Sequence, residues 1–188
     1  MSASVLPMPG PPLPTAIGLG SNLGDPPALI RQAVHLLAEA GLADVCLSSL
    51  YRSVAVDCLH GTPDFVNAAL IGLWGGSPRE LLAACQGIER RLGRPFPHSS
   101  REARLIDLDI LLLGECVLQT LELQLPHPRL QERLFALLPL SEVAPAWRIP
   151  PGNRTVAEVC RTLLARQGPG TAVERYGPGP AAGAGPAV

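Results

Sequence analysis

The spacing of apolar residues along the chain changes several times between a strand-like and a helix-like period, and each change marks a predicted element. Short apolar or alternating runs predict strands, whereas apolar residues that recur every three or four positions predict amphipathic helices. The predicted elements, in order, are a strand at 16–20, a helix at 26–41, strands at 45–52 and 65–74, a helix at 77–93, a strand at 104–113 and a last helix at 156–164.

The first six of these elements follow the order β-α-β-β-α-β, which is typical of a ferredoxin-like α+β fold. In such a fold an antiparallel sheet carries helices on one face and leaves the other face free for a functional site. We therefore expect a ferredoxin-like core with an extra C-terminal helix. Two polar segments, at 53–64 and 94–102, are expected to form mobile loops beside the sheet.

Residues at the predicted helix ends support these boundaries. Asp25 followed by Pro26 suits an N-cap and a first helical position, and Ser77 with Glu80 has the spacing of a capping box. Residues 1–13 are rich in proline and residues 168–188 are rich in glycine, proline and alanine. We expect both terminal segments to be disordered and a single domain to span residues 14–167.

The charged residues exclude several classes of function. The net charge is −1, from 15 basic and 16 acidic residues, so the chain lacks the basic excess typical of nucleic-acid binding. All of the basic residues are arginines. The absence of lysine excludes a Walker A loop, a pyridoxal-phosphate Schiff base and a lysine nucleophile. If the protein binds phosphates, arginine side chains or metal ions must contact them.

The cysteines and the hydropathy of the chain predict the cellular location of the protein. Its five cysteines are widely spaced without a Cys-x-x-Cys pair, which favours reduced thiols that serve as small buried hydrophobic side chains over a metal site. The proline-rich start does not resemble a signal peptide, and no apolar run approaches the ~20 residues of a membrane span. We expect a cytoplasmic monomer that acts on small molecules and has no nucleic-acid or membrane partner.

Asp107 and Asp109 lie within the apolar segment 104–113, where carboxylates are unfavourable unless they have a function. In a strand, alternate side chains share a face, so the two aspartates point the same way with Cα atoms roughly 6.5 Å apart. Such a pair predicts either raised pKa values or a bound cation, and carboxylate oxygens favour Mg²⁺. The alternative is a surface edge strand whose polar face happens to be acidic.

Other candidate residues are weaker signals when each is taken alone. Phe65 and Asn67 share one strand face and suit a flat heterocycle, although a core phenylalanine beside a surface asparagine is the simpler interpretation. The Gly18-x-Gly20 pair resembles a dinucleotide fingerprint, but its spacing is wrong and a tight turn explains it equally well. His127, between two prolines, is more typical of a loop than of a ligand.

Taken together, six segments closely resemble the 6-hydroxymethyl-7,8-dihydropterin pyrophosphokinase family of folate biosynthesis, over roughly residues 15–165. The matching segments are 20–23 (GSNL), 48–52 (SSLYR), 65–69 (FVNAA), 92–94 (LGR), 104–111 (RLIDLDIL) and 126–128 (PHP). The resemblance implies transfer of pyrophosphate from ATP to the hydroxymethyl oxygen of the pterin, with attack at the β-phosphorus and release of AMP. It also implies two Mg²⁺ ions bound between the protein and the nucleotide.

The resemblance implies a role for each matching residue. The metal ligands would be Asp107 and Asp109, and the catalytic arginines Arg94 and Arg104. Contacts to ATP would come from Gln86, Glu89, Ile110, His127 and Arg133. The pterin would be bound by Val56, Phe65, Asn67 and Phe135.

The sequence departs from the family pattern at several positions near these residues. Val54-Ala55-Val56 replaces a usual proline pair and leucine, so the substrate loop should be less rigid. Phe96, Arg101 and Pro128 also replace frequent arginine, tryptophan and tyrosine residues. Two alternatives therefore stay open: a relative that binds pterin or nucleotide without catalysis, and a different two-metal enzyme such as a nucleotidyl cyclase or a polymerase-like domain.

Overall fold

The computed structural model describes residues 11–55, 61–93, 103–167 and 173–177. Its strands are β1 (Leu13–Ser21), β2 (Ala43–Leu47), β3 (Tyr51–Ser53), β4 (Phe65–Trp74), β5 (Asp107–Leu113), β6 (Leu118–Gln119), β7 (Gln124–Leu125) and β8 (Val173–Arg175). Its helices are α1 (Pro26–Glu39), α2 (Pro78–Arg91), α3 (Leu134–Val143) and α4 (Val156–Gln167), with a 3-10 turn at Leu130–Glu132. No helix in these ranges is long and apolar enough to cross a membrane.

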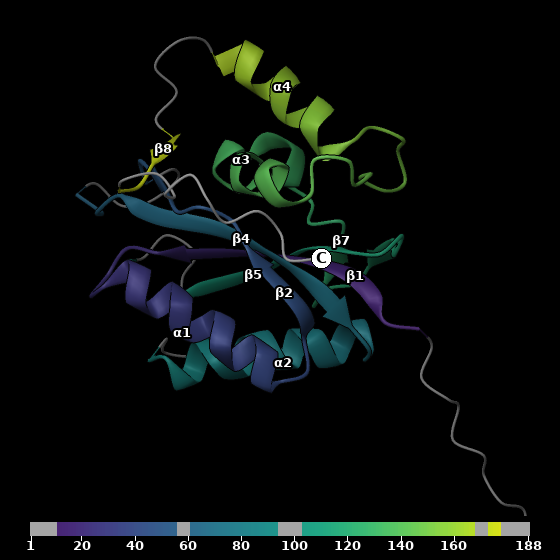
Figure 1. Ribbon diagram of the computed structural model, residues 1–188, viewed down its shortest axis with the longest axis horizontal. Helices are drawn as coiled ribbons and strands as arrows, with labels where there is room; N and C mark the ends of the chain where they lie inside the picture. Colours follow the sequence, from purple (N-terminus) through teal and green to yellow (C-terminus); the bar gives the residue numbers. More distant parts are fainter. Residues whose placement is uncertain (1–10, 56–60, 94–102, 168–172, 178–188) are drawn as a thin grey trace, which may run out of the picture.

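The main sheet has the strand order β5-β1-β4-β3-β8, with β2 also paired to β4, and every pair is antiparallel. Helices α1 and α2 lie on one face of this sheet (Figure 1). This arrangement confirms the predicted ferredoxin-like α+β fold. The strand predicted at 65–74 is β4, whereas the strand predicted at 45–52 is two shorter strands, because β2 and β3 pair separately with β4.

The second face of the sheet is less open than the sequence predicted. Helix α3 packs against β4 on this face, and α4 lies on the outer side of α3 (Figure 1). Leu137 and Leu140 of α3 are fully buried in a second core, which continues to Val156 and Val159 of α4. The described residues therefore include two additional helices where one was expected, since the first seven residues of α3 are all apolar and must be enclosed.

The helix ends follow the predicted chemistry. The Asp25 side chain accepts a hydrogen bond from the backbone N–H of Ala28, and Ser77 with Glu80 forms a complete capping box at the start of α2.

The cysteines differ from each other in burial. Cys85 and Cys160 are buried as predicted, whereas Cys46 is exposed, so the expectation of buried thiols is wrong there.

The C-terminal segment differs from the expectation of disorder, because residues 173–175 form strand β8 along the edge of β3. Glu142, near the end of α3, stabilises this edge by accepting hydrogen bonds from the Ser49 backbone and hydroxyl and from the Tyr51 hydroxyl. Arg175 of β8 lies 3.7 Å from the same carboxylate. The prediction for the tail is therefore wrong at 173–175, and the rest of 168–188, apart from 176–177, lies outside the described residues.

Candidate active site

Residues of three neighbouring strands lie in one row across the sheet, and two of them, Asn67 and Asp107, are predicted site residues. Gly20 of β1 is paired with Asp107 of β5 on one side and with Asn67 of β4 on the other. A Cβ atom added at Gly20 would lie 3.4 Å from Asn67 Oδ1, 3.8 Å from the Phe65 ring and 3.9 Å from Asp107 Cβ. The glycine therefore leaves bare backbone between a carboxylate and an amide that face the same side.

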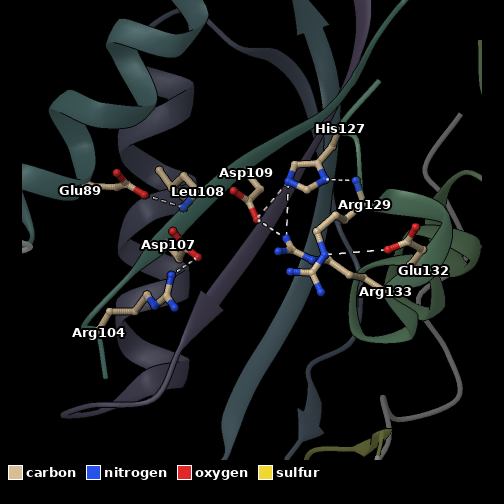
Figure 2. A network of polar contacts seen from close by, with 9 residues as sticks. All are labelled: Glu89, Arg104, Asp107, Leu108, Asp109, His127, Arg129, Glu132 and Arg133. Atoms are coloured by element: carbon tan, nitrogen blue, oxygen red, sulfur yellow. Dashed lines mark hydrogen bonds and ion pairs between the residues drawn. The ribbon is translucent and has the colours of Figure 1, made fainter. Parts of the chain in front are cut away.

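The alternation along β5 places the aspartates as predicted. Leu108 and Ile110 are buried in the core beneath α1 and α2, so Asp107 and Asp109 point to the opposite face. Their side chains are 23% and 39% exposed, which leaves both carboxylates accessible to a solute. Although β5 is an edge strand, its acidic face is not merely solvated, because both aspartates contact basic side chains (Figure 2).

Each aspartate contacts an arginine that also lies over a phenylalanine ring. Arg104 donates to Asp107 Oδ2 at 2.7 Å, and its guanidinium carbon is 5.4 Å from the centre of the Phe65 ring. Arg133 donates to Asp109 Oδ2 at 3.3 Å, and its guanidinium carbon is 5.5 Å from the centre of the Phe135 ring. The structure thus brings the predicted phosphate-binding and pterin-binding residues into two mixed clusters.

His127 lies beside Asp109 and Arg133 at one end of the site. Its Nδ1 accepts a hydrogen bond from the Arg129 backbone N–H, and its Nε2 lies 3.9 Å from Asp109 Oδ2 and 3.4 Å from Arg133 Nη1 (Figure 2). Burial and the nearby Arg133 charge lower the pKa of His127 to about 4. The imidazole is therefore neutral at physiological pH and presents Nε2–H towards the aspartate.

Glu89 lies on a buried face of α2 rather than on a solvated one. It is 7% exposed, and its Oε1 accepts a hydrogen bond from the backbone N–H of Leu108, between the two aspartates (Figure 2). Gln86, three residues earlier, is exposed on α2. Ile110 is buried in β5. The contacts of these three residues to ATP, which the resemblance implied, stay predictions.

Two predicted site residues, Val56 and Arg94, lie outside the described residues, as do the departures Phe96 and Arg101. The departure Pro128 is exposed and follows His127 directly.

Sequence reasoning missed Asn22, although it lies in one of the matching segments. Its Oδ1 accepts from the Arg104 backbone N–H at 2.7 Å, its backbone N–H donates to the Arg104 carbonyl, and its amide donates to the Pro63 carbonyl. Asn22 therefore holds Arg104, in the segment that leads into β5, against the end of β1. An amide next to glycine and serine is an ordinary turn signal, and nothing in the sequence shows that its partner is 82 positions away.

The side chains present suit a hard divalent cation in part. Asp107 and Asp109 supply carboxylate oxygens on one face, and these are the protein ligands that Mg²⁺ prefers. The described part of the chain holds no group of three or more histidine, cysteine, aspartate or glutamate side chains arranged for a metal. Such a cation would therefore take its remaining ligands from water and from a bound phosphate group, as Mg²⁺ in nucleotide sites usually does.

A ferredoxin-like sheet with paired aspartates, flanking arginines and an adjacent aromatic and amide surface has the groups that an enzyme needs to transfer phosphoryl groups from a nucleotide to a small flat molecule. A model of the 7,8-dihydro-6-hydroxymethylpterin-pyrophosphokinase (HPPK) family matches residues 16–145. The chain belongs to this family.

Several bacterial relatives are named as pyrophosphokinases. The 2-amino-4-hydroxy-6-hydroxymethyldihydropteridine pyrophosphokinase of Bacillus subtilis is 41% identical over 132 residues, which cover 68% of this chain and 75% of the relative. The enzyme of that name in Methylorubrum extorquens is 38% identical over 151 residues, 78% of this chain and 91% of the relative. The Synechocystis enzyme is 35% identical over 76% of this chain and 72% of its own length.

Solved structures share the fold. The Plasmodium falciparum HPPK-DHPS wild-type structure with pterin and p-hydroxybenzoate aligns with a TM-score of 0.64 and 15% identity, over 83% of this chain and 44% of the other. The chain thus spans less than half of that longer protein. A folate synthesis bifunctional protein of Chlamydia caviae is 37% identical, but this chain covers only 30% of it.

Proposed function

We propose that this protein transfers the pyrophosphoryl group of ATP to the hydroxymethyl oxygen of 6-hydroxymethyl-7,8-dihydropterin and releases AMP, a step of folate biosynthesis. Membership of the HPPK family supports this reaction. The observation that carries it is the row formed by Asp107, Gly20 and Asn67, which places a carboxylate and an amide on one sheet face. Two strand spacings separate these side chains by roughly 10 Å, which leaves room for the two substrates to meet.

The reaction exchanges one phosphorus–oxygen bond for another. The hydroxymethyl oxygen forms a bond to the β-phosphorus and loses its proton, while the bond from that phosphorus to the oxygen bridging to the α-phosphorus breaks. AMP leaves with the bridging oxygen. Because such a transfer needs little covalent chemistry from the protein, its residues act mainly by aligning the two oxygens and stabilising negative charge.

Asp107 and Asp109 would hold two Mg²⁺ ions, since they supply hard oxygen ligands from one accessible face. When bound, the ions neutralise phosphate charge and make the hydroxyl more acidic. In the structure each aspartate contacts an arginine, and this supports a role for Arg104 and Arg133 in binding the phosphates. If an aspartate held a cation, its arginine would keep its contact with the phenylalanine ring and could donate to the phosphate oxygens.

Phe65, Phe135 and Asn67 would bind the pterin. Aromatic side chains contribute area for stacking, and the amide offers a paired donor and acceptor to the edge of the ring. The neutral His127 contributes an N–H donor without adding charge beside the nucleotide. Roles for Arg94, Val56, Gln86, Glu89 and Ile110 in binding follow from the resemblance and stay predictions, as do the cytoplasmic location and the monomeric state.

The decisive experiment incubates the purified chain with ATP, MgCl₂ and the hydroxymethyl dihydropterin and separates the products by chromatography. We expect AMP and the pyrophosphorylated pterin in equal amounts, and neither product when Mg²⁺ is chelated. Ligand binding without AMP would instead support a non-catalytic relative. Formation of a cyclic nucleotide, or extension of a primer, would support a different two-metal enzyme.

A further inference from the structure

The row of paired residues that contains Asn67 continues to the far edge of the sheet. Beyond Asn67 it passes to Tyr51 of β3 and then to Arg175 of β8, the last strand on this side (Figure 1). Directly opposed residues of antiparallel strands present their side chains on the same face, with Cβ atoms roughly 4.5–5.5 Å apart. The Tyr51 side chain is therefore the neighbour of Asn67 on the side away from Gly20. It is 6% exposed, and the Arg175 guanidinium carbon lies 6.0 Å from the centre of its ring.

One carboxylate holds this end of the row. Glu142 of α3 accepts hydrogen bonds through Oε1 from the Ser49 backbone N–H and hydroxyl, at 3.2 and 2.8 Å, and through Oε2 from the Tyr51 hydroxyl at 2.8 Å. Its Oε2 also lies 3.7 Å from Arg175 Nη2. Burial alone would raise the pKa of Glu142, but the hydrogen bonds from Ser49 and Tyr51 and the charge of Arg175 outweigh burial and lower the pKa. Glu142 is therefore ionised at physiological pH and joins α3 to both β3 and β8.

Two adjacent side chains of β8 connect it to β3 on opposite faces of the sheet. Arg175 contacts Glu142 and Tyr51 on the face that carries the site. Glu174 points to the other face, where its carboxylate lies 3.2 Å from the Arg52 guanidinium. Both β8 residues lie after residues 16–145, which match the family model. They therefore allow the contact on the site face to be compared with a contact of the same two strands that faces away from it.

We propose that Glu142 is a positioning residue for pterin binding, which holds the Tyr51 side chain beside Asn67 and connects the site to Arg175 of the C-terminal strand. This inference rests on the proposed function and deepens it. Without Glu142, the buried Tyr51 hydroxyl loses its acceptor and the ring has no fixed position. Asn67 then loses an ordered neighbour, and the pterin must order both side chains when it binds, which weakens its affinity.

The expected effect on binding is that of a side chain which the ligand must order, typically about a three- to tenfold change in an equilibrium constant. We expect Glu142→Ala to raise the Kd for the dihydropterin by this factor, in the presence of a non-hydrolysable ATP analogue and Mg²⁺. Arg175→Ala should raise it about threefold, and Arg175→Lys should restore most of the binding because it keeps the charge. The Kd for the ATP analogue should stay unchanged, because the contacts of Glu142 lie at the opposite end of the row from Asp107.

Glu174 offers a matched control on the same strand. Glu174→Ala removes the ion pair with Arg52 but leaves the groups that contact Glu142 in place. We expect this variant to lower the melting temperature slightly and to leave the pterin Kd unchanged. An equal rise in the pterin Kd in Arg175→Ala and Glu174→Ala would show that β8 contributes only as a strand, and it would overturn the proposal.

A spectroscopic measurement separates positioning from a general loss of stability. The side-chain amide signals of Asn67 in an NMR spectrum of the isotope-labelled chain report on the neighbouring Tyr51 ring. Without any ligand, these signals should shift in Glu142→Ala and Arg175→Ala but not in Glu174→Ala. Unshifted signals in the first two variants would contradict the proposed contact. A protein that is merely loosened would instead bind the ATP analogue more weakly as well.

Calorimetric titration of the full chain measures each Kd, and circular dichroism confirms that each variant is folded. If Glu142→Ala does not fold, Arg175→Ala decides the question, since the Arg175 side chain is 47% exposed. Wild-type pterin affinity in the folded variants would overturn the proposal, and so would failure of Arg175→Lys to restore binding. A wild-type chain that binds the dihydropterin without releasing AMP would refute the proposed reaction alone, because the role of Glu142 is tested by binding.

Discussion

Glu89 accepts a hydrogen bond from the backbone N–H of Leu108 at 2.8 Å, and this bond joins α2 to the outer edge of the strand that carries both aspartates. Because β5 is the last strand of the sheet, a backbone donor on its outer side has no strand partner. The buried carboxylate takes that place and fixes β5 between Asp107 and Asp109.

Removing this carboxylate should destabilise the protein and disturb the site. We expect Glu89→Ala to lower the free energy of unfolding by about 1–3 kcal/mol, since it leaves a buried N–H without its partner. Glu89→Gln keeps an acceptor oxygen and should retain most of the stability. Urea denaturation followed by circular dichroism measures both variants, and equal stability of Glu89→Ala and the wild type would contradict the assignment.

The paired aspartates should be essential for turnover but not for folding. We expect Asp107→Asn and Asp109→Asn each to reduce the rate of AMP release at least about 10²-fold, because an amide binds Mg²⁺ less strongly and contributes no charge. Both side chains are partly exposed, so the melting temperature should change little. Glu122→Gln, at an exposed position in the β6–β7 turn, serves as the control. Near-normal AMP release by both aspartate variants would contradict the role.

A side chain added at Gly20, which lies between Asp107 and Asn67, should interfere with substrate binding. Gly20→Ala places its Cβ at ordinary contact distance from Asn67, Phe65 and Asp107, so the variant should fold and show a raised KM for the pterin. Gly20→Val should reduce binding further. Gly18→Ala is a matched control, because the atoms nearest to its Cβ would belong to the Leu111 side chain. Steady-state kinetics with each substrate varied in turn measures these effects. Equal KM values for both alanine variants would contradict the role of Gly20 in the substrate-binding surface.

The buried His127 should make stability depend on pH in a defined direction. Its pKa falls from an ordinary value of 6.5 to about 4 in the folded protein, so the unfolded chain binds more protons between these values. Stability should therefore fall as the pH drops from about 6.5 to about 4, by up to about 3 kcal/mol from this residue.

Denaturation of the metal-free protein at several pH values measures this dependence, and His127→Asn should weaken it. The imidazole signals in an NMR titration should have their midpoint near pH 4. A midpoint near the ordinary histidine value would contradict the burial and charge environment described for the site.

Local patterns in the sequence were sufficient for most of the fold. The capping box at Ser77 and Glu80 and the alternation along 104–113 depend on neighbouring residues, so they could be recognised without a structure. The apolar segment 134–143 showed no clear period, because α3 is buried on several sides and needs no polar face. Strand β8 could not be predicted, since it is short and depends on pairing with β3, which lies far away in the sequence.

The sequence by itself determined the chemical groups of the site and the strand face that carries Asp107 and Asp109, since alternation in a strand depends only on spacing. Tertiary structure decided which groups meet. It placed Gly20 between Asp107 and Asn67, joined Ser53 to the amide of Asn67, and turned Glu89 from a helix surface into a buried partner of β5. These contacts join residues far apart in the chain, and their free energy depends on burial and hydrogen bonding that exist only once the sheet has formed.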